Sequence, residues 1–275
     1  MTKGKFKWSN LYIILVFIIL YLPIGYLIAY SFNSAGNMSD FTGFTLEHYQ
    51  TLFADQRLLS FIMNTFIIAL LSATIATAIG TFGAIAIYYA RLNSQRQFLL
   101  NTNNVLMVTP DVMMGASFLI LFSSILPLRL GFWSVLLAHV AFSIPIVVLM
   151  ILPRLYEMNP NMITAAQDLG ATHWQILSRV VIPSIVRGIV SGFFMAFTYS
   201  LDDFAVTFFV TGNGFSTVSI EVYSRARTGI SLEINALSTL MFVLALALVF
   251  GYYQIQTSDQ RRIRKQANKK VGGLR

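Results

Sequence analysis

Cysteine is absent from all 275 residues, so the chain contains no disulfide, no thiolate nucleophile and no cysteine-ligated zinc. Charge is also scarce, because Asp, Glu, Lys and Arg make up only 11% of the residues where a soluble domain carries about 25%. Histidine occurs at His48, His139 and His173, which fall on an early loop, inside an apolar segment and on a later loop. We therefore expect no shared metal site, no cofactor and no catalytic residues.

Long apolar runs make up most of the sequence. Hydrophobic residues account for 56% of the chain, which leaves too few polar residues to cover a water-facing surface. A helix needs about 20 apolar residues to cross a hydrocarbon core of roughly 30 Å, and lipid excludes open strand edges. The sequence therefore predicts one all-α membrane domain over residues 1–275, with spans at about 11–32, 61–90, 98–126, 132–155, 188–210 and 234–254.

Two of these runs have unusual features. The second run is free of charge for so long that we expect it to protrude beyond the bilayer or to include a short preceding helix. Pro23, Pro110 and Pro145 lie within spans and predict kinks, which neighbouring helices can accommodate. The first run lacks a small-residue cleavage pattern and is interpreted as a retained anchor.

The basic residues lie mainly on one side of the predicted spans. If the N-terminus is cytoplasmic, the cytoplasmic segments carry all of the 19 Lys and Arg residues except Arg57, Arg129, Arg225 and Arg227. The positive-inside rule then predicts that both termini are cytoplasmic. The net charge of +8 is concentrated in the tail after residue 260, which we expect beside anionic lipid headgroups and not on nucleic acid.

The loop between the fourth and fifth spans carries a short helix with marked ends. Asn159 suits the N-cap, Pro160 the first helical position and Gly170 the left-handed residue that ends a helix. Two adjacent alanines in between keep one surface thin, so another protein can approach the backbone closely. The pattern favours a docking helix, although a capped connector would carry the same residues.

The same loop resembles the cytoplasmic signature of ATP-driven importer permeases: Glu-Ala-Ala, three residues, Gly, nine residues, then Ile-x-Leu-Pro. At that spacing this chain has Thr164, Ala165, Ala166, Gly170 and then Val180-Val181-Ile182-Pro183. Thr164 replaces the glutamate, which removes one possible salt bridge to the ATPase. The resemblance implies that loop 157–185 couples to an ATPase through Thr164, Ala165, Ala166, Asp168, Leu169, Gly170 and Pro183.

Further stretches are similar to the second permease subunit of spermidine/putrescine importers. They include Ser31-Phe32-Asn33-Ser34, Pro110-Asp111, Gly131-Phe132-Trp133-Ser134, Asp168-Leu169-Gly170-Ala171, Asp202-Asp203, Phe209-Val210-Thr211-Gly212 and Asn235-Ala236-Leu237. The resemblance implies a type I ABC importer permease in a bacterial cell membrane, and transport of polyamines into the cytoplasm. It also implies a heterodimer with a second permease subunit, two copies of an ATPase subunit and an extracytoplasmic polyamine-binding protein.

Three carboxylates fall within expected spans, Asp111 in the third and Asp202 with Asp203 in the fifth. Each costs about 2.5–3.5 kcal/mol at the bilayer centre, so they should line a polar pathway, cap broken helices or pair with donors. No Lys or Arg lies in the interior of a span, which makes a travelling cation a suitable partner. Adjacent helical residues point about 100° apart, so both members of the pair cannot face one pore centre.

Aromatic residues beside the span-five pair are candidates for cation–π contacts with a polyamine. The candidate substrate pathway therefore consists of Asp111, Tyr199, Asp202, Asp203 and Phe204. Two structural alternatives stay open: Asp111 could cap a half-helix begun by Pro110, and His139 is expected to be a buried histidine with satisfied hydrogen bonds rather than a proton relay.

Other functions fit fewer of these features. A permease for ferric ion, sulfate or another oxyanion would share the coupling loop, but an oxyanion pathway would be expected to carry basic or donor-rich sites. A stand-alone secondary transporter would explain the acidic spans, but it needs no coupling helix and usually shows paired broken helices in internal repeats. A membrane enzyme needs a convergent nucleophile, base or metal set.

The absence of cysteine makes the predicted orientation directly testable. A single cysteine in loop 33–57 should react with an impermeant thiol reagent in intact cells, because this loop is expected outside. Lys265→Cys should react only after permeabilisation. Labelling of position 265 in intact cells would refute the orientation.

Overall fold

The computed structural model describes residues 8–36, 38, 40–228 and 232–272. Lys3, Lys5, Lys7 and Arg275, which contribute to the predicted orientation, lie outside these ranges. The described chain is helical, with one isolated backbone bridge between Asn33 and Phe44 and no strand. It divides into two compact units, one from residues 1–60 and 221–251 and the other from residues 61–220 and 252–275.

The first unit holds the N-terminal helix and an ordered loop. Its helices are α1 (Trp8–Tyr30), α2 (Glu47–Ala54), most of α11 (Val218–Thr228) and the apolar first half of α12 (Leu232–Gly272). Between α1 and α2 the chain folds around Asn33, which is fully buried. The Asn33 amide donates to the Asp40 carbonyl at 2.7 Å and its Oδ1 accepts from the Thr42 N–H at 3.0 Å. This asparagine therefore holds the loop together.

The second unit contains the helices that build the candidate site. They are α3 (Gln56–Tyr89, of which all but the first turn belongs here), α4 (Asn93–Val108), α5 (Asp111–Ile120) with a π-helical turn at Leu121–Ile125, α6 (Phe132–Glu157), α7 (Asn161–Asp168), α8 (His173–Ile176), a second π-helical turn at Leu177–Val181, α9 (Ile182–Asp202) and α10 (Ala205–Val210). At 34 residues α3 is about 51 Å long, more than the hydrocarbon core requires.

Five helical segments in the described chain are long and apolar enough to cross a membrane, and a sixth is broken. The broken segment is the third expected span, where α4 and α5 meet at an angle of 105°. The sequence predicted a kink at Pro110 and left open a half-helix begun by that proline. Thr109 and Pro110 are both extended, with ψ of 129° and 137°, because proline disfavours a helical conformation in the residue before it and has no N–H to continue the helix.

The fifth expected span, 188–210, also differs from a single helix. The structure ends α9 at Asp202, and Asp203 is extended at φ −64° and ψ 126° before α10 begins. Asp202 is thus the last residue of α9 and does not lie in the middle of one continuous helix.

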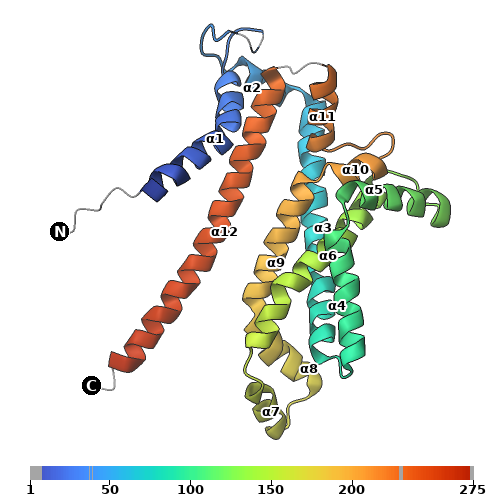
Figure 1. The fold of residues 1–275 in the computed structure, drawn as a ribbon, viewed down its shortest axis with the longest axis vertical. Coiled ribbons are helices and arrows are strands. Elements are labelled where there is room, and N and C mark those ends of the chain that lie inside the picture. The colour runs from blue at the N-terminus through green and yellow to red at the C-terminus, as the bar shows by residue number, and fades with distance from the viewer. Residues whose placement is uncertain (1–7, 37, 39, 229–231, 273–275) are drawn as a thin grey trace. The chain divides into compact units, whose positions relative to one another are not determined.

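Glycines allow α3, α6 and α9 to approach closely. A Cβ on Gly80 of α3 would lie 2.7 Å from Val147 Cγ1 of α6, and one on Gly192 of α9 would lie 3.2 Å from the same atom. A Cβ on Gly188 would lie 3.0 Å from the Met150 carbonyl. Figure 1 shows α6 and α9 side by side, with α7 and α8 at the opposite end of this pair from α5 and α10.

Candidate functional site

The break between α9 and α10 is closed by the Asp203 carboxylate. One oxygen accepts from the Val206 N–H at 3.3 Å, and the other accepts from the Thr207 N–H at 2.8 Å and the Thr207 hydroxyl at 2.7 Å. The first N–H groups of a helix have no partner within it, so Asp203 satisfies two of them in α10. Its side chain is only 7% exposed. Asp203 therefore acts as a helix cap.

A buried histidine lies against this cap. His139 of α6 is 1% exposed, and both ring nitrogens have partners: Nδ1 lies 2.6 Å from Ser200 Oγ and Nε2 lies 2.8 Å from Thr207 Oγ1. Nε2 also lies 3.4 Å from Asp203 Oδ2. Ser200 Oγ is in turn 2.9 Å from Ser72 Oγ on α3. His139 is thus a satisfied buried histidine, as the sequence predicted.

The other face of the same helix end is polar and exposed. Tyr199 is 37% exposed, and its hydroxyl donates to Asp111 Oδ1 at 2.9 Å. Asp202 lies three residues further along α9, so it shares this face with Tyr199. Asp202 is exposed, and its carboxylate forms no hydrogen bond or ion pair with the described residues. The structure therefore brings Asp111 and Tyr199 together, places Asp202 beside Tyr199 on one helix face, and turns Asp203 inward.

Asp111 does not cap α5 with its side chain. It is the first residue of that helix, no side-chain cap hydrogen bond is present there, and its carboxylate accepts from Tyr199 instead. A carboxylate in the first turn is still favoured by the helix dipole. The alternative that Asp111 caps a half-helix through its side chain is therefore not what the structure shows.

The two exposed carboxylates differ in their electrostatic surroundings. Asp111 lies at a helix N-terminus, where backbone N–H groups stabilise negative charge. Asp202 lies at the C-terminus of α9, where free carbonyl groups add further negative potential. Among the described residues no Lys or Arg forms an ion pair with either one. A helix C-terminus whose free carbonyl groups lie beside a carboxylate is a suitable site for a cation.

Phe204 is the remaining residue of the candidate pathway. It is partly buried at the α9–α10 break, and its ring packs on Phe208 with centroids 5.5 Å apart. Phe142 of α6 supports the exposed face instead, because its ring meets that of Tyr199 edge-on at 4.9 Å.

Asn159 and Gly170 flank the predicted docking helix. Asn159 Oδ1 accepts from the Asn161 N–H at 3.0 Å, and Gly170 has a φ of +77°. The Gly170 N–H bonds the Gln167 carbonyl at 2.9 Å and the Ala171 N–H bonds the Ala166 carbonyl at 3.0 Å, which together form a Schellman motif. The left-handed Gly170 confirms the predicted C-terminal end, whereas α7 has Pro160 at its N-cap and begins at Asn161, one residue later than predicted.

This helix, α7, packs little against its own chain. None of its residues is buried, and Met162 is 47% exposed. Thr164, Ala165 and Asp168 are exposed, Ala166 is half-buried, and Leu169 just beyond the helix is 89% exposed. Gln167 lines a groove of about 200 Å³ towards α8 and the end of α3, so it lies on the inner side. The exposed side combines the small Ala165, the apolar Met162 and Leu169, and the polar Thr164 and Asp168.

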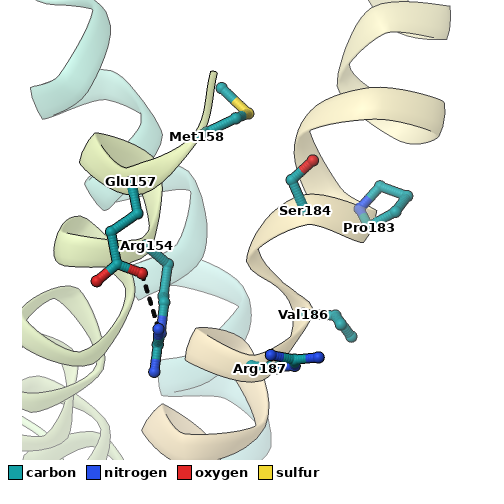
Figure 2. Close-up of a pocket in the computed structure, with 7 residues that line it drawn as sticks. All are labelled: Arg154, Glu157, Met158, Pro183, Ser184, Val186 and Arg187. Atoms are coloured by element: carbon teal, nitrogen blue, oxygen red, sulfur yellow. Dashed lines mark hydrogen bonds and ion pairs between the residues drawn. The ribbon is translucent and has the colours of Figure 1, made fainter. Parts of the chain in front are cut away.

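Pro183 stands where the loop joins α9. It follows a π-helical turn at Leu177–Val181, and a proline there suits such a turn because it cannot donate the next helical hydrogen bond. Figure 2 shows the pocket of about 470 Å³ beside it, between the end of α6 and the start of α9. Arg154 and Arg187 line this pocket, with Glu157 bonded to Arg154 at 2.8 Å. Two guanidinium groups would repel a polycation.

Sequence reasoning missed the connection among His139, Ser200 and Thr207. Asp203 itself was a usable signal, because Asp is among the residues preferred at helix starts. The partner of His139 was not foreseeable, since it depends on how α6 packs on α9. Within the described ranges no three His, Asp or Glu residues form a group that could hold a metal ion.

Comparison with known proteins places this geometry in a family. Residues 76–265 match the profile of the family described as "binding-protein-dependent transport system inner membrane component". The spermidine/putrescine transport system permease protein PotC of Haemophilus influenzae is 38% identical, over 90% of this chain and 95% of that protein. PotC of Escherichia coli K12 is 37% identical over 86% and 89%, and the putrescine permease PotI of the same strain is 33% identical over 94% of both chains.

Solved structures show the same fold at lower identity. A chain of the bacterial alginate ABC transporter, in complex with an alginate pentasaccharide-bound periplasmic protein, superposes with a TM-score of 0.71 at 18% identity, covering 93% of this chain and 95% of that one. A chain of the inward-facing MetNI methionine ABC transporter gives a TM-score of 0.64 at 16% identity, covering 74% and 98%. The chain therefore belongs to the binding-protein-dependent transport system inner membrane components, as a non-catalytic, multi-pass permease with the type I ABC importer fold.

Proposed function

We propose that this permease carries polyamines, spermidine or putrescine, into the cytoplasm. The observation that carries the proposal is the exposed acidic face formed by Asp111, Tyr199 and Asp202, in which neither carboxylate has a basic partner among the described residues. A polyamine supplies separated ammonium groups for such carboxylates. The similar permeases PotC and PotI are named for spermidine/putrescine and putrescine transport, which agrees with this chemistry.

Membership of the family implies a partner permease, an ATPase and a substrate-binding protein. In the specific assembly that we propose, this chain forms a heterodimer with a second permease, two copies of an ATPase subunit bind below, and an extracytoplasmic polyamine-binding protein delivers substrate. Both termini are cytoplasmic in this proposal, which places α7 on the ATPase side. The distribution of Lys and Arg supports this orientation.

Coupling to the ATPase is assigned to the loop 157–185 and centres on α7. The exposed surface of α7 includes the short side chain of Ala165, so a partner can approach the backbone closely. Leu169, just beyond the helix, has an apolar side chain that is mostly exposed in the isolated chain. Burial of such a side chain against a partner is favourable by about 1.5–3 kcal/mol. This supports docking through Thr164, Ala165, Ala166, Asp168, Leu169 and Gly170, with Pro183 at the joint to α9.

An oxyanion permease is the main alternative, and the fold alone does not exclude it, since permeases of the same fold occur in alginate and methionine transporters. The charges of the candidate site argue against it. The exposed carboxylates of the candidate site would repel an anion. Arg154 and Arg187, which line the pocket beside Pro183, lie at the opposite end of α9 from these carboxylates.

The coupling role predicts that Ala165→Glu uncouples transport while the permease still inserts and assembles, because a bulky charged group would separate α7 from the ATPase. Gln167→Glu is the matched control, since it adds the same charge on the inner side of the same helix. Polyamine uptake and stimulated ATP hydrolysis in reconstituted complexes are the measurements. Equal uptake and coupling in wild type and Ala165→Glu would show that this surface does not dock the ATPase.

The acidic face predicts that Asp202→Asn loses roughly tenfold or more in uptake per complex, since a hydrogen bond to a charged group contributes about 1.5–3 kcal/mol. Asn keeps the size of the side chain, and the exposed position makes normal abundance the expected result. Asp203→Asn should instead lower complex abundance, because it weakens the cap of α10. Normal uptake in both Asp202→Asn and Asp111→Asn at normal abundance would defeat the proposed pathway.

A further inference from the structure

A chain of side-chain hydrogen bonds connects four helices of the second unit at the α9–α10 break. It runs from Ser72 on α3 to Ser200 on α9, then through the His139 ring on α6 to Thr207 on α10, with successive distances of 2.9, 2.6 and 2.8 Å. All four residues are at least 97% buried. The His139 ring is the middle member, and it connects Ser200 of α9 with Thr207 of α10.

The donors in this chain can be assigned from its ends. The Thr207 hydroxyl donates to the Asp203 carboxylate at 2.7 Å, so its oxygen is left to accept from His139 Nε2–H. At the other end, the Ser72 hydroxyl donates to the Ala69 carbonyl at 3.3 Å and shares a hydrogen bond with Ser200, which in turn bonds His139 Nδ1.

The chain fixes which way the end of α9 faces. Ser200 and Asp203 are three residues apart and both point to His139, whereas Tyr199 and Asp202 are also three apart and point outward. A rotation of this helix end would move both pairs together. Phe142, one turn beyond His139 on α6, contacts the His139 ring at 4.9 Å and the Tyr199 ring at 4.9 Å, which supports both faces from the same helix.

We propose that His139 is a positioning residue for transport. By holding Ser200 and, through Thr207, the Asp203 cap, it sets the rotation of the α9 end and so presents Tyr199 and Asp202 beside Asp111. His139 is buried and does not touch the substrate. The inference rests on the proposed function, because it assigns His139 a role in arranging the acidic face proposed above.

Three variants separate positioning from general stability. His139→Leu fills the space but removes both hydrogen bonds, whereas His139→Gln retains one donor and one acceptor at the end of its side chain. Val140→Ala is the control, because Val140 is the buried neighbour on the same helix and takes no part in the hydrogen-bond chain. Each variant is introduced into the full permease and purified in its membrane complex.

Two readouts are measured on assembled complexes. Hydrogen exchange of the Val206 and Thr207 amides, which bond Asp203, should accelerate roughly tenfold in His139→Leu, as expected for the loss of about one hydrogen bond, and should recover in His139→Gln. Uptake of spermidine per complex, at saturating loaded binding protein, should fall at least about tenfold in His139→Leu and return to within about threefold of wild type in His139→Gln. Val140→Ala should leave both readouts unchanged.

Unaltered amide exchange in His139→Leu would overturn the proposal, and so would altered exchange with normal uptake per complex. Equal losses in Val140→Ala would show an ordinary packing effect and would also overturn it. If the wild-type complex takes up no polyamine, the proposed function fails by itself, and the exchange readout still decides whether His139 sets the conformation of the break.

Discussion

Two amide groups at the start of α10 have no partner within that helix, and the Asp203 carboxylate accepts hydrogen bonds from both. A broken helix at membrane depth persists only where its freed backbone groups are bonded. Because Asp203 meets this requirement from the inner face of α9, its neighbour Asp202 is left on the outer face without a bonded partner in the described chain. The cap thus stabilises the break, while the neighbouring carboxylate stays available.

The candidate pathway and the predicted coupling loop lie at the two ends of one helix. α9 runs about 30 Å from Ile182, next to the π-helical turn and Pro183, to Asp202 at the break. Gly188 and Gly192 keep it in close contact with α6, whose own residue His139 reaches the far end. A displacement at the loop can therefore reach the acidic face through a rigid, closely packed pair of helices.

Much of the fold could be predicted from the sequence, because apolar runs identify helices in lipid and the caps of α7 have distinct residues at both ends. The two breaks were underestimated. Hydropathy treats 98–126 and 188–210 as continuous, whereas Pro110 turns the chain by 105° and Asp203 ends a helix by binding the next one. The separate roles of Asp202 and Asp203 were foreseen in outline from helix geometry, but which residue turns inward depends on contacts with His139 that a single sequence does not reveal.

The central claim is that an acidic face, with no basic partner in the described chain, carries a polycation. The most direct test is ATP-dependent uptake by the reconstituted transporter with its binding protein, using labelled spermidine, putrescine, sulfate and ferric ion in parallel. The account predicts uptake of one or both polyamines, with no uptake of sulfate or ferric ion. Uptake of sulfate or ferric ion without uptake of either polyamine would contradict it.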